Sequence, residues 1–252
     1  HLYGKATLQD LPTTPTIVIK ATNLQTGKLW RFSREAMGDW TIGRIPAPRF
    51  QLAKAVAASA AFPPLLSPAV LTVKPTDFLP DEAGENTRPP FNSRILLADG
   101  GVYDNLGLET AFKLWATLIV SDAGMRPSAA PKVGTDPLRQ TIRVLEVADA
   151  QVRALRKRQL LDLFTRDEPT HNGAYFSTNS DIRNYKLPDT LPCPLERTQQ
   201  LATVPTRLAK MGKELQQRLI NWGYAISDAG ARRHLLRAGV RAPEGFPYGA
   251  GV

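Results

Sequence analysis

The chain has 252 residues, and 32 Lys and Arg against 23 Asp and Glu give it a formal charge of +9. This balance excludes an acidic, tail-like protein, and the 42% hydrophobic residues are enough for a sizeable core. The length fits one large domain or two small ones, since domains run to roughly 100–200 residues; we favour one. No apolar run approaches the about 18 residues that a membrane-spanning helix needs.

Cysteine content and charge narrow the function classes further. The single cysteine, Cys193, excludes an internal disulfide and a zinc site built from cysteines. The positive charge favours attraction to anionic lipid surfaces or nucleic acid. Its two basic runs, residues 153–158 and 232–234, fall on expected helices, where such runs are usually solvated faces. Because no nucleic-acid-binding motif accompanies them, we expect no specific nucleic-acid partner.

The first ninety residues alternate between strand-like runs and turns. Residues 16–22 and 28–32 are rich in β-branched and aromatic side chains, and the turn residues between them predict a β-hairpin. The alanine-rich residues 51–61 predict a close-packing helix that ends at a pair of prolines. A short strand is expected at 70–73, and the Pro-, Asp- and Gly-rich residues 75–90 predict a surface loop.

The next segment carries the pattern that decides the fold class. Residues 94–98 form a buried-type apolar strand, residues 106–115 have apolar side chains at helical spacing, and residues 116–120 form a second buried-type strand. The order strand, turn, helix, strand is typical of an α/β unit. The sequence therefore predicts an α/β fold with a mostly parallel central sheet.

Helices dominate the remaining chain. A long basic amphipathic helix is expected at 138–164, followed by a strand at 173–177. Two further helices are expected, from Val204-Pro205 to about 219 and from 220 to 239, while residues 197–203 are ambiguous.

The segment with the clearest chemical pattern is Asp-Gly-Gly-Val-Tyr-Asp-Asn-Leu-Gly at residues 99–107. Its first residue, Asp99, ends a predicted strand, and α/β sheets place ligands and catalytic groups at such ends. Gly100 and Gly101 permit a sharp turn and the close approach of another group. We therefore expect Asp99 to act as a general base. The structural alternative is that Asp99 caps the helix that follows.

Other polar residues near this segment have plainer interpretations. Asp104 and Asn105 are expected to cap the next helix rather than to contact substrate. Tyr103 either lines a pocket or packs in the core. Asp122 ends the next predicted strand, but no motif accompanies it.

Histidine and metal chemistry have little support in the sequence. The three histidines are His1, His171 and His234, and none has ligand spacing with another or with a nearby carboxylate. A Ser–His–Asp triad needs a well-placed imidazole, whereas a dyad needs none. We expect no metal and no cofactor.

The segment at residues 99–107 resembles the Asp-Gly-Gly motif of the patatin-like phospholipases of bacterial type. Residues 55–63 look like the small-residue helix that precedes this motif in the family, and residues 17–28 are similar to its strand before a hairpin. Residues 221–225, Asn-Trp-Gly-Tyr-Ala, look like the tail of a bacterial branch. The resemblance thus touches most of the chain, in the family's order.

The resemblance implies a serine hydrolase that cleaves carboxylic esters of phospholipids or related lipids with a Ser–Asp dyad. On this basis Asp99 is the general base, and Gly100, Gly101 and Tyr103 lie at the substrate. The implied fold is a three-layer patatin-like α/β fold with a mostly parallel sheet, incomplete in this chain. Residues 1–252 would be the C-terminal portion of one catalytic domain, with 220–252 a helical extension.

The chain departs from the family pattern at the nucleophile. The family's Gly-x-Ser-x-Gly elbow and Gly-rich oxyanion loop are both absent from these 252 residues. We therefore expect an N-terminal fragment of the same protein to supply them, and this chain to be inactive alone. The expected partners are this fragment, a lipid ester substrate and an anionic membrane surface. The expected location is the cytoplasm or the membrane periphery, with secretion as an effector as the alternative. The alternative function is a catalytically inactive patatin-like module that binds lipid or protein.

Overall fold

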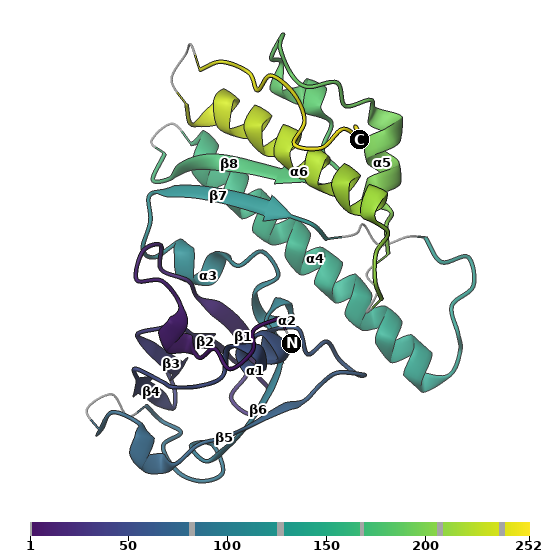
Figure 1. The fold of residues 1–252 in the computed structure, drawn as a ribbon. Coiled ribbons are helices and arrows are strands. Elements are labelled where there is room, and N and C mark those ends of the chain that lie inside the picture. Colours follow the sequence, from purple (N-terminus) through teal and green to yellow (C-terminus); the bar gives the residue numbers. More distant parts are fainter. Residues whose placement is uncertain (1, 81–83, 125–128, 167–168, 206–208, 237–239) are drawn as a thin grey trace. The chain divides into compact units, whose positions relative to one another are not determined.

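The computed structural model describes residues 2–80, 84–124, 129–166, 169–205, 209–236 and 240–252. Its contacts divide the chain into two compact units, His1–Glu109 and Thr110–Val252, whose elements are labelled in Figure 1. Each unit has its own hydrophobic core.

The first unit is built on a six-stranded antiparallel sheet. Its strands lie in the order β4-β3-β2-β1-β6-β5, and every neighbouring pair is antiparallel. Because β1 pairs with β2, the predicted hairpin is confirmed, and β1 also pairs with β6 on its other side. The strands are β1 (Ile19–Asn23), β2 (Lys28–Phe32), β3 (Ala36–Asp39), β4 (Gly43–Pro46), β5 (Ala69–Thr72) and β6 (Arg94–Asp99).

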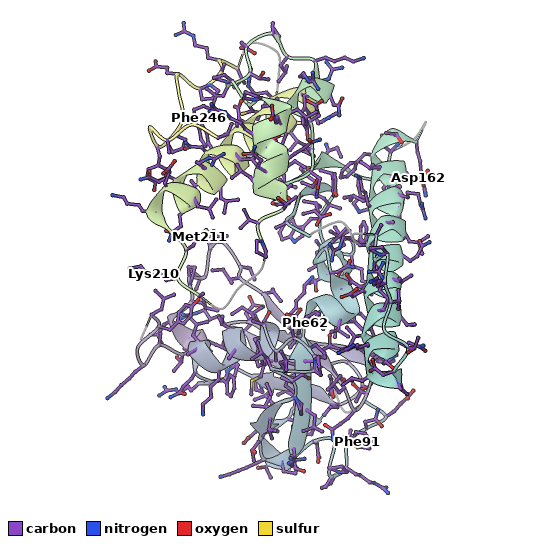
Figure 2. The ribbon with its side chains drawn as sticks, turned by 90° about the vertical axis from the view of Figure 1, so that its right-hand side faces the viewer. Phe62, Phe91, Asp162, Lys210, Met211 and Phe246 are labelled. Carbon is purple, nitrogen blue, oxygen red and sulfur yellow. The ribbon has the colours of Figure 1, made fainter. Side chains whose placement is uncertain are left out.

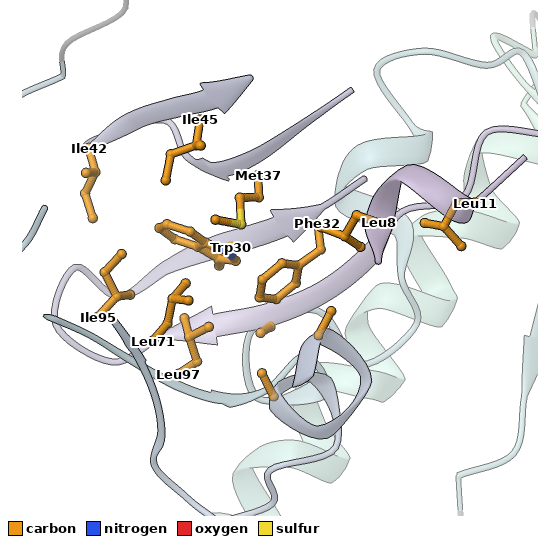
Figure 3. Packing of buried hydrophobic residues seen from close by; sticks show 13 residues of the cluster. Leu8, Leu11, Trp30, Phe32, Met37, Ile42, Ile45, Leu71, Ile95 and Leu97 are labelled. Atoms are coloured by element: carbon orange, nitrogen blue, oxygen red, sulfur yellow. The ribbon is translucent and has the colours of Figure 1, made fainter. Parts of the chain in front are cut away.

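Helix α1 (Leu52–Ser59) lies against β1 and β6. Its buried residues are Ala55 and Ala58, whose small side chains permit the close packing predicted for residues 51–61. Large apolar side chains from the sheet complete the core, as Figure 3 shows. The core residues labelled there are Leu8, Leu11, Trp30, Phe32, Met37, Ile42, Ile45, Leu71, Ile95 and Leu97.

Short helical turns connect these elements. The 3-10 turns η1 (Leu8–Asp10) and η2 (Pro75–Asp77) lie in the first unit, the latter inside the predicted loop at 75–90, of which residues 81–83 lie outside the described residues. The helix predicted at 106–115 is instead two helices of four residues, α2 (Gly101–Asp104) and α3 (Leu108–Ala111).

The second unit contains a parallel pair of strands and three helices. Strands β7 (Thr117–Asp122) and β8 (Asn172–Ser177) run parallel. Helices α4 (Pro137–Thr165) and α6 (Lys213–His234) lie against β8, and α5 (Leu195–Ala202) lies against α6. A 3-10 turn, η4 (Ile182–Tyr185), also contacts α6. The predicted long helix and the strand after it are confirmed as α4 and β8.

The C-terminal helices differ from the prediction. The sequence predicts one helix up to residue 219 and a second from 220 to 239, but a single helix, α6, runs through this junction from Lys213. Residues 206–208 and 237–239, at the outer ends of the two predictions, lie outside the described residues. The ambiguous residues 197–203 fall largely in α5.

The predicted mostly parallel central sheet is wrong. The larger sheet is antiparallel throughout, and among the strands of the described residues only β7 and β8 run parallel. Residues 94–98 and 116–120 were predicted as strands of one α/β unit, but β6 pairs with β1 and β5, whereas β7 pairs with β8. A parallel neighbour needs a crossover, usually a helix packed on the sheet. The four-residue helices α2 and α3 do not form one, so the implied three-layer α/β architecture is corrected to two separate sheets.

Candidate functional site

Asp99 is the last residue of β6, and hydrogen bonds fix its backbone. Its N–H donates to the Ala61 carbonyl at 2.9 Å, and the next N–H, of Gly100, donates to the Ser59 carbonyl at 3.1 Å. The Asp99 carbonyl accepts the Thr22 hydroxyl at 2.7 Å. Strand β1 and the segment at the end of α1 together therefore set the position of the Asp99 backbone.

The Asp99 side chain folds back over the start of α2. Its Oδ1 accepts the Gly101 N–H at 2.7 Å, which fixes the turn into α2, whereas the N-cap position of α2 is occupied by Gly100. A Cβ on Gly100 would lie 2.5 Å from the Lys20 carbonyl oxygen, so only glycine fits there without a shift. A Cβ on Gly101 would lie 3.0 Å from Asp99 Oδ1. Both positions therefore favour glycine for steric reasons. Both backbone N–H groups already have acceptors within the fold, so neither is available to a substrate.

Strand β1 supports this segment through two side chains on one face. Lys20 and Thr22 are two residues apart and therefore point to the same side of the strand. The Thr22 hydroxyl, which donates to the Asp99 carbonyl, also accepts the Tyr103 N–H at 3.2 Å. Tyr103 is half-buried, and its backbone thus joins α2 to β1.

Lys20 forms a buried ion pair beneath the same segment. Its Nζ lies 3.1 Å from Asp104 Oδ2, with the two side chains 14% and 0% exposed, and it also donates to the Gly107 carbonyl. The Asp104 carboxylate in turn accepts the N–H groups of Leu108 at 3.0 Å and Glu109 at 2.8 Å, which confirms its predicted capping role. A buried charge pair needs such further hydrogen bonds to offset desolvation.

Sequence reasoning missed Lys20 and Thr22. Both lie in a run interpreted only as half of a hairpin. The available signal was the alternation of polar Lys20 and Thr22 with apolar Ile19 and Ala21, which marks a strand with one polar face.

The segments that adjoin Asp99 carry exposed apolar side chains. Phe62 follows Ala61, whose carbonyl accepts the Asp99 N–H, and it is exposed, as are Leu65 and Val102. Phe62 is labelled in Figure 2. Residues 55–73 contain no charged side chain. Exposed hydrocarbon is thus present in both segments that adjoin Asp99, the one after α1 and α2.

Asp122 has a comparable arrangement in the second unit. It ends β7, and its Oδ1 accepts the Gly124 N–H at 2.8 Å, as Asp99 accepts that of Gly101. Its other oxygen, Oδ2, accepts the Tyr175 hydroxyl at 2.7 Å. Burial, this hydrogen bond and the Asp122 charge all raise the pKa of Tyr175, so the hydroxyl remains a donor. Both oxygens of Asp122 are therefore engaged within the fold.

The histidines have structural contacts. His171 Nε2 lies 3.1 Å from the Phe112 carbonyl oxygen. The His234 ring packs edge-on to Tyr185, and burial, with a contribution from the Arg233 charge, lowers the pKa of His234. His1 lies outside the described residues. Across the described ranges, the His, Cys, Asp and Glu side chains form no cluster of three or more suited to a metal ion.

Comparisons with protein-family models, curated proteins and solved structures find no match to this chain. None of the helices within the described ranges is long and apolar enough to cross a bilayer.

Proposed function

We propose that this chain supplies the general base of a lipid acyl hydrolase that uses a Ser–Asp dyad. The base is Asp99, and the nucleophilic serine and oxyanion hole come from a segment outside these 252 residues. The observation that carries the proposal is a carboxylate at a strand end whose backbone is held by hydrogen bonds with Thr22 and Ala61 and whose Oδ1 accepts the Gly101 N–H. Exposed apolar side chains lie in the adjoining segments of the chain. A base whose position is fixed in advance needs little reorganisation during the reaction.

The proposed reaction has two halves. The serine Oγ attacks the ester carbonyl carbon while its proton passes to the Asp99 carboxylate. The tetrahedral intermediate collapses to an acyl-enzyme, and protonated Asp99 gives its proton to the departing alcohol. Water then attacks the acyl carbon with Asp99 again accepting the proton. A second collapse returns that proton to the serine oxygen and releases the fatty acid.

The apolar surroundings favour a lipid ester as the substrate. Phe62, Leu65 and Val102 offer contact to acyl chains, and the charge-free residues 55–73 place no ionised side chain of their own against the hydrocarbon. Burying apolar surface stabilises such a complex by about 25 cal/mol per Å².

One observation favours a second candidate, an inactive module that binds lipid or protein. The Asp99 carboxylate already has a structural role, because its Oδ1 accepts the Gly101 N–H at the turn into α2. In that case the residue stabilises the turn and performs no chemistry.

The full-length protein tests the two candidates. Hydrolysis of a short-chain p-nitrophenyl ester and of phospholipid vesicles is measured for wild type, Asp99→Asn and Asp122→Asn, with folding checked by circular dichroism. The amide oxygen of the substituted side chain can still accept the Gly101 N–H, so Asp99→Asn should fold. Loss of the base should lower kcat by roughly 10²–10⁴-fold. Asp122→Asn changes the comparable carboxylate in the other unit and should remain active. Hydrolysis unchanged in Asp99→Asn, or absent from the folded wild type, refutes the hydrolase.

A further inference from the structure

Helix α4 carries many exposed apolar side chains, among them Val144 and Val147. Its residues at positions 138, 145 and 152, and at 141, 148 and 155, repeat every seven, so they form one stripe along the helix. Other faces of the helix contain Leu160, which is fully buried, and Lys157, whose Nζ lies 4.6 Å from the Tyr175 ring centroid on β8. The exposed stripe consists of Leu138, Thr141, Leu145, Ala148, Val152 and Leu155. We call these six residues the α4 stripe.

Basic side chains flank the α4 stripe. The helix carries six Lys and Arg against three Asp and Glu, a net charge of +3. Arg156 and Arg158 fall on opposite sides of the stripe at 100° per residue. Figure 2 shows side chains along α4, with Asp162 labelled toward its C-terminal end. The ion pairs Arg143–Glu146 and Arg153–Asp149 use two of the three acids.

We propose that α4 lies on the surface of an anionic phospholipid membrane, with the α4 stripe at the level of the acyl chains and the flanking cations among the headgroups. A helix with an apolar face, a basic flank and low net hydrophobicity binds in the plane of the interface. Each Lys or Arg near an anionic surface adds attraction. The inference deepens the proposed function, because a lipid hydrolase must reach its substrate at this surface.

A second copy of the chain is the competing occupant of the stripe. The seven-residue repeat runs only from Leu138 to Leu155, fewer than the three to four heptads that indicate a coiled coil. The excess of cations instead matches the negative charge of lipid headgroups.

The test is vesicle co-sedimentation of the full-length protein. The vesicles are phosphatidylcholine alone and phosphatidylcholine mixed with phosphatidylserine. Wild type should bind the mixed vesicles more tightly, and added salt should weaken this binding. Leu145→Gln with Leu155→Gln removes two stripe residues that are 60% and 55% exposed, so folding should persist. The partition coefficient should fall roughly tenfold for each substitution.

Two further variants are compared with wild type in the same vesicle assay. Leu114→Gln, at a leucine 64% exposed and outside α4, should bind as wild type does. Arg158→Gln should weaken binding to the mixed vesicles roughly fivefold and leave binding to phosphatidylcholine alone unchanged. The inference is overturned if wild type does not bind the mixed vesicles, or if the double variant binds them as tightly as wild type does. So does a dimer in solution that the double variant dissociates without altering vesicle binding.

The vesicle assay is independent of the hydrolase proposal. Asp99→Asn should bind vesicles as wild type does, because Asp99 lies outside α4. Hydrolysis of the soluble ester that depends on Asp99, without vesicle binding, would leave the hydrolase intact and refute the role of α4. Vesicle binding without any hydrolysis would refute the hydrolase and leave the role of α4 intact.

Discussion

Replacing Lys20 with methionine tests the buried ion pair beneath Asp99. Lys20→Met keeps most of the side-chain volume but removes the donor that pairs with Asp104 at 3.1 Å and that also bonds the Gly107 carbonyl. The Asp104 carboxylate, fully buried, keeps its two backbone donors, Leu108 and Glu109, but loses the opposite charge.

The expected loss in free energy of unfolding follows from this geometry. Truncating one member of a buried ion pair costs about 3–5 kcal/mol. Since two N–H groups still stabilise the Asp104 carboxylate, we expect the lower end, about 3 kcal/mol. Adding Asp104→Asn should recover part of this loss, because burying a neutral amide costs less free energy than burying an unpaired carboxylate.

The free energy of unfolding is measured by urea denaturation. Hydrogen–deuterium exchange of β1 and β6 peptides at each urea concentration reports on the first unit alone. Lys28→Met, the same change on the neighbouring strand β2, is the control. Lys28 Nζ lies 5.2 Å from the centroid of the exposed Trp40 ring, and such a contact contributes only about 0.5–1 kcal/mol. If Lys20→Met costs no more than Lys28→Met, Lys20 does not stabilise the buried carboxylate and the reasoning is refuted.

Two further predictions concern a glycine and the single cysteine. Gly100→Ala should cost about 1–3 kcal/mol in thermal unfolding, because its Cβ would lie 2.5 Å from the Lys20 carbonyl oxygen. Gly101→Ala should cost less, since the nearest atom to its Cβ is 3.0 Å away; equal costs would contradict the steric argument. Burial raises the pKa of the Cys193 thiol from 9.0 to about 11. Its neutral form therefore stabilises the fold fully below pH 9, and this contribution is lost as the pH rises toward 11. Thiolate absorbance that appears near pH 9 in the folded chain, or pH curves identical for wild type and Cys193→Ser, would show that burial does not hold the proton.

Local patterns predicted several elements but not how the strands pair. The β-rich runs at 16–22 and 28–32 contain the turn that joins them, so their antiparallel pairing follows from nearby residues. The apolar run at 94–98 indicates a buried strand but carries no mark of its neighbours. Its partner β1 lies more than seventy residues earlier, and pairing at that distance depends on the whole sheet.

The residues of the site likewise fall into those that local sequence patterns predict and those that they do not. The sequence predicts the Asp-Gly-Gly segment because its residues are contiguous and each one helps to form the local backbone turn. Lys20 and Thr22 were missed because they are 84 and 77 residues from the Asp104 and Asp99 atoms that they contact. The capping role of Asp104 was predictable, because a cap is a local interaction. Its partner Lys20 was not, because an ion pair between distant segments leaves no spacing to recognise.

The pairing of β1 with two strands bears on which changes of length the chain tolerates. Ala21 lies opposite Asp99, and its core-facing position places Lys20 and Thr22 on the other side. A one-residue insertion or deletion within β1 would reverse this alternation and point Lys20 into the apolar core. Because both edges of β1 are paired, a bulge would disrupt two ladders at once. Variation in length should therefore accumulate in the connection between β5 and β6, leaving β1 fixed.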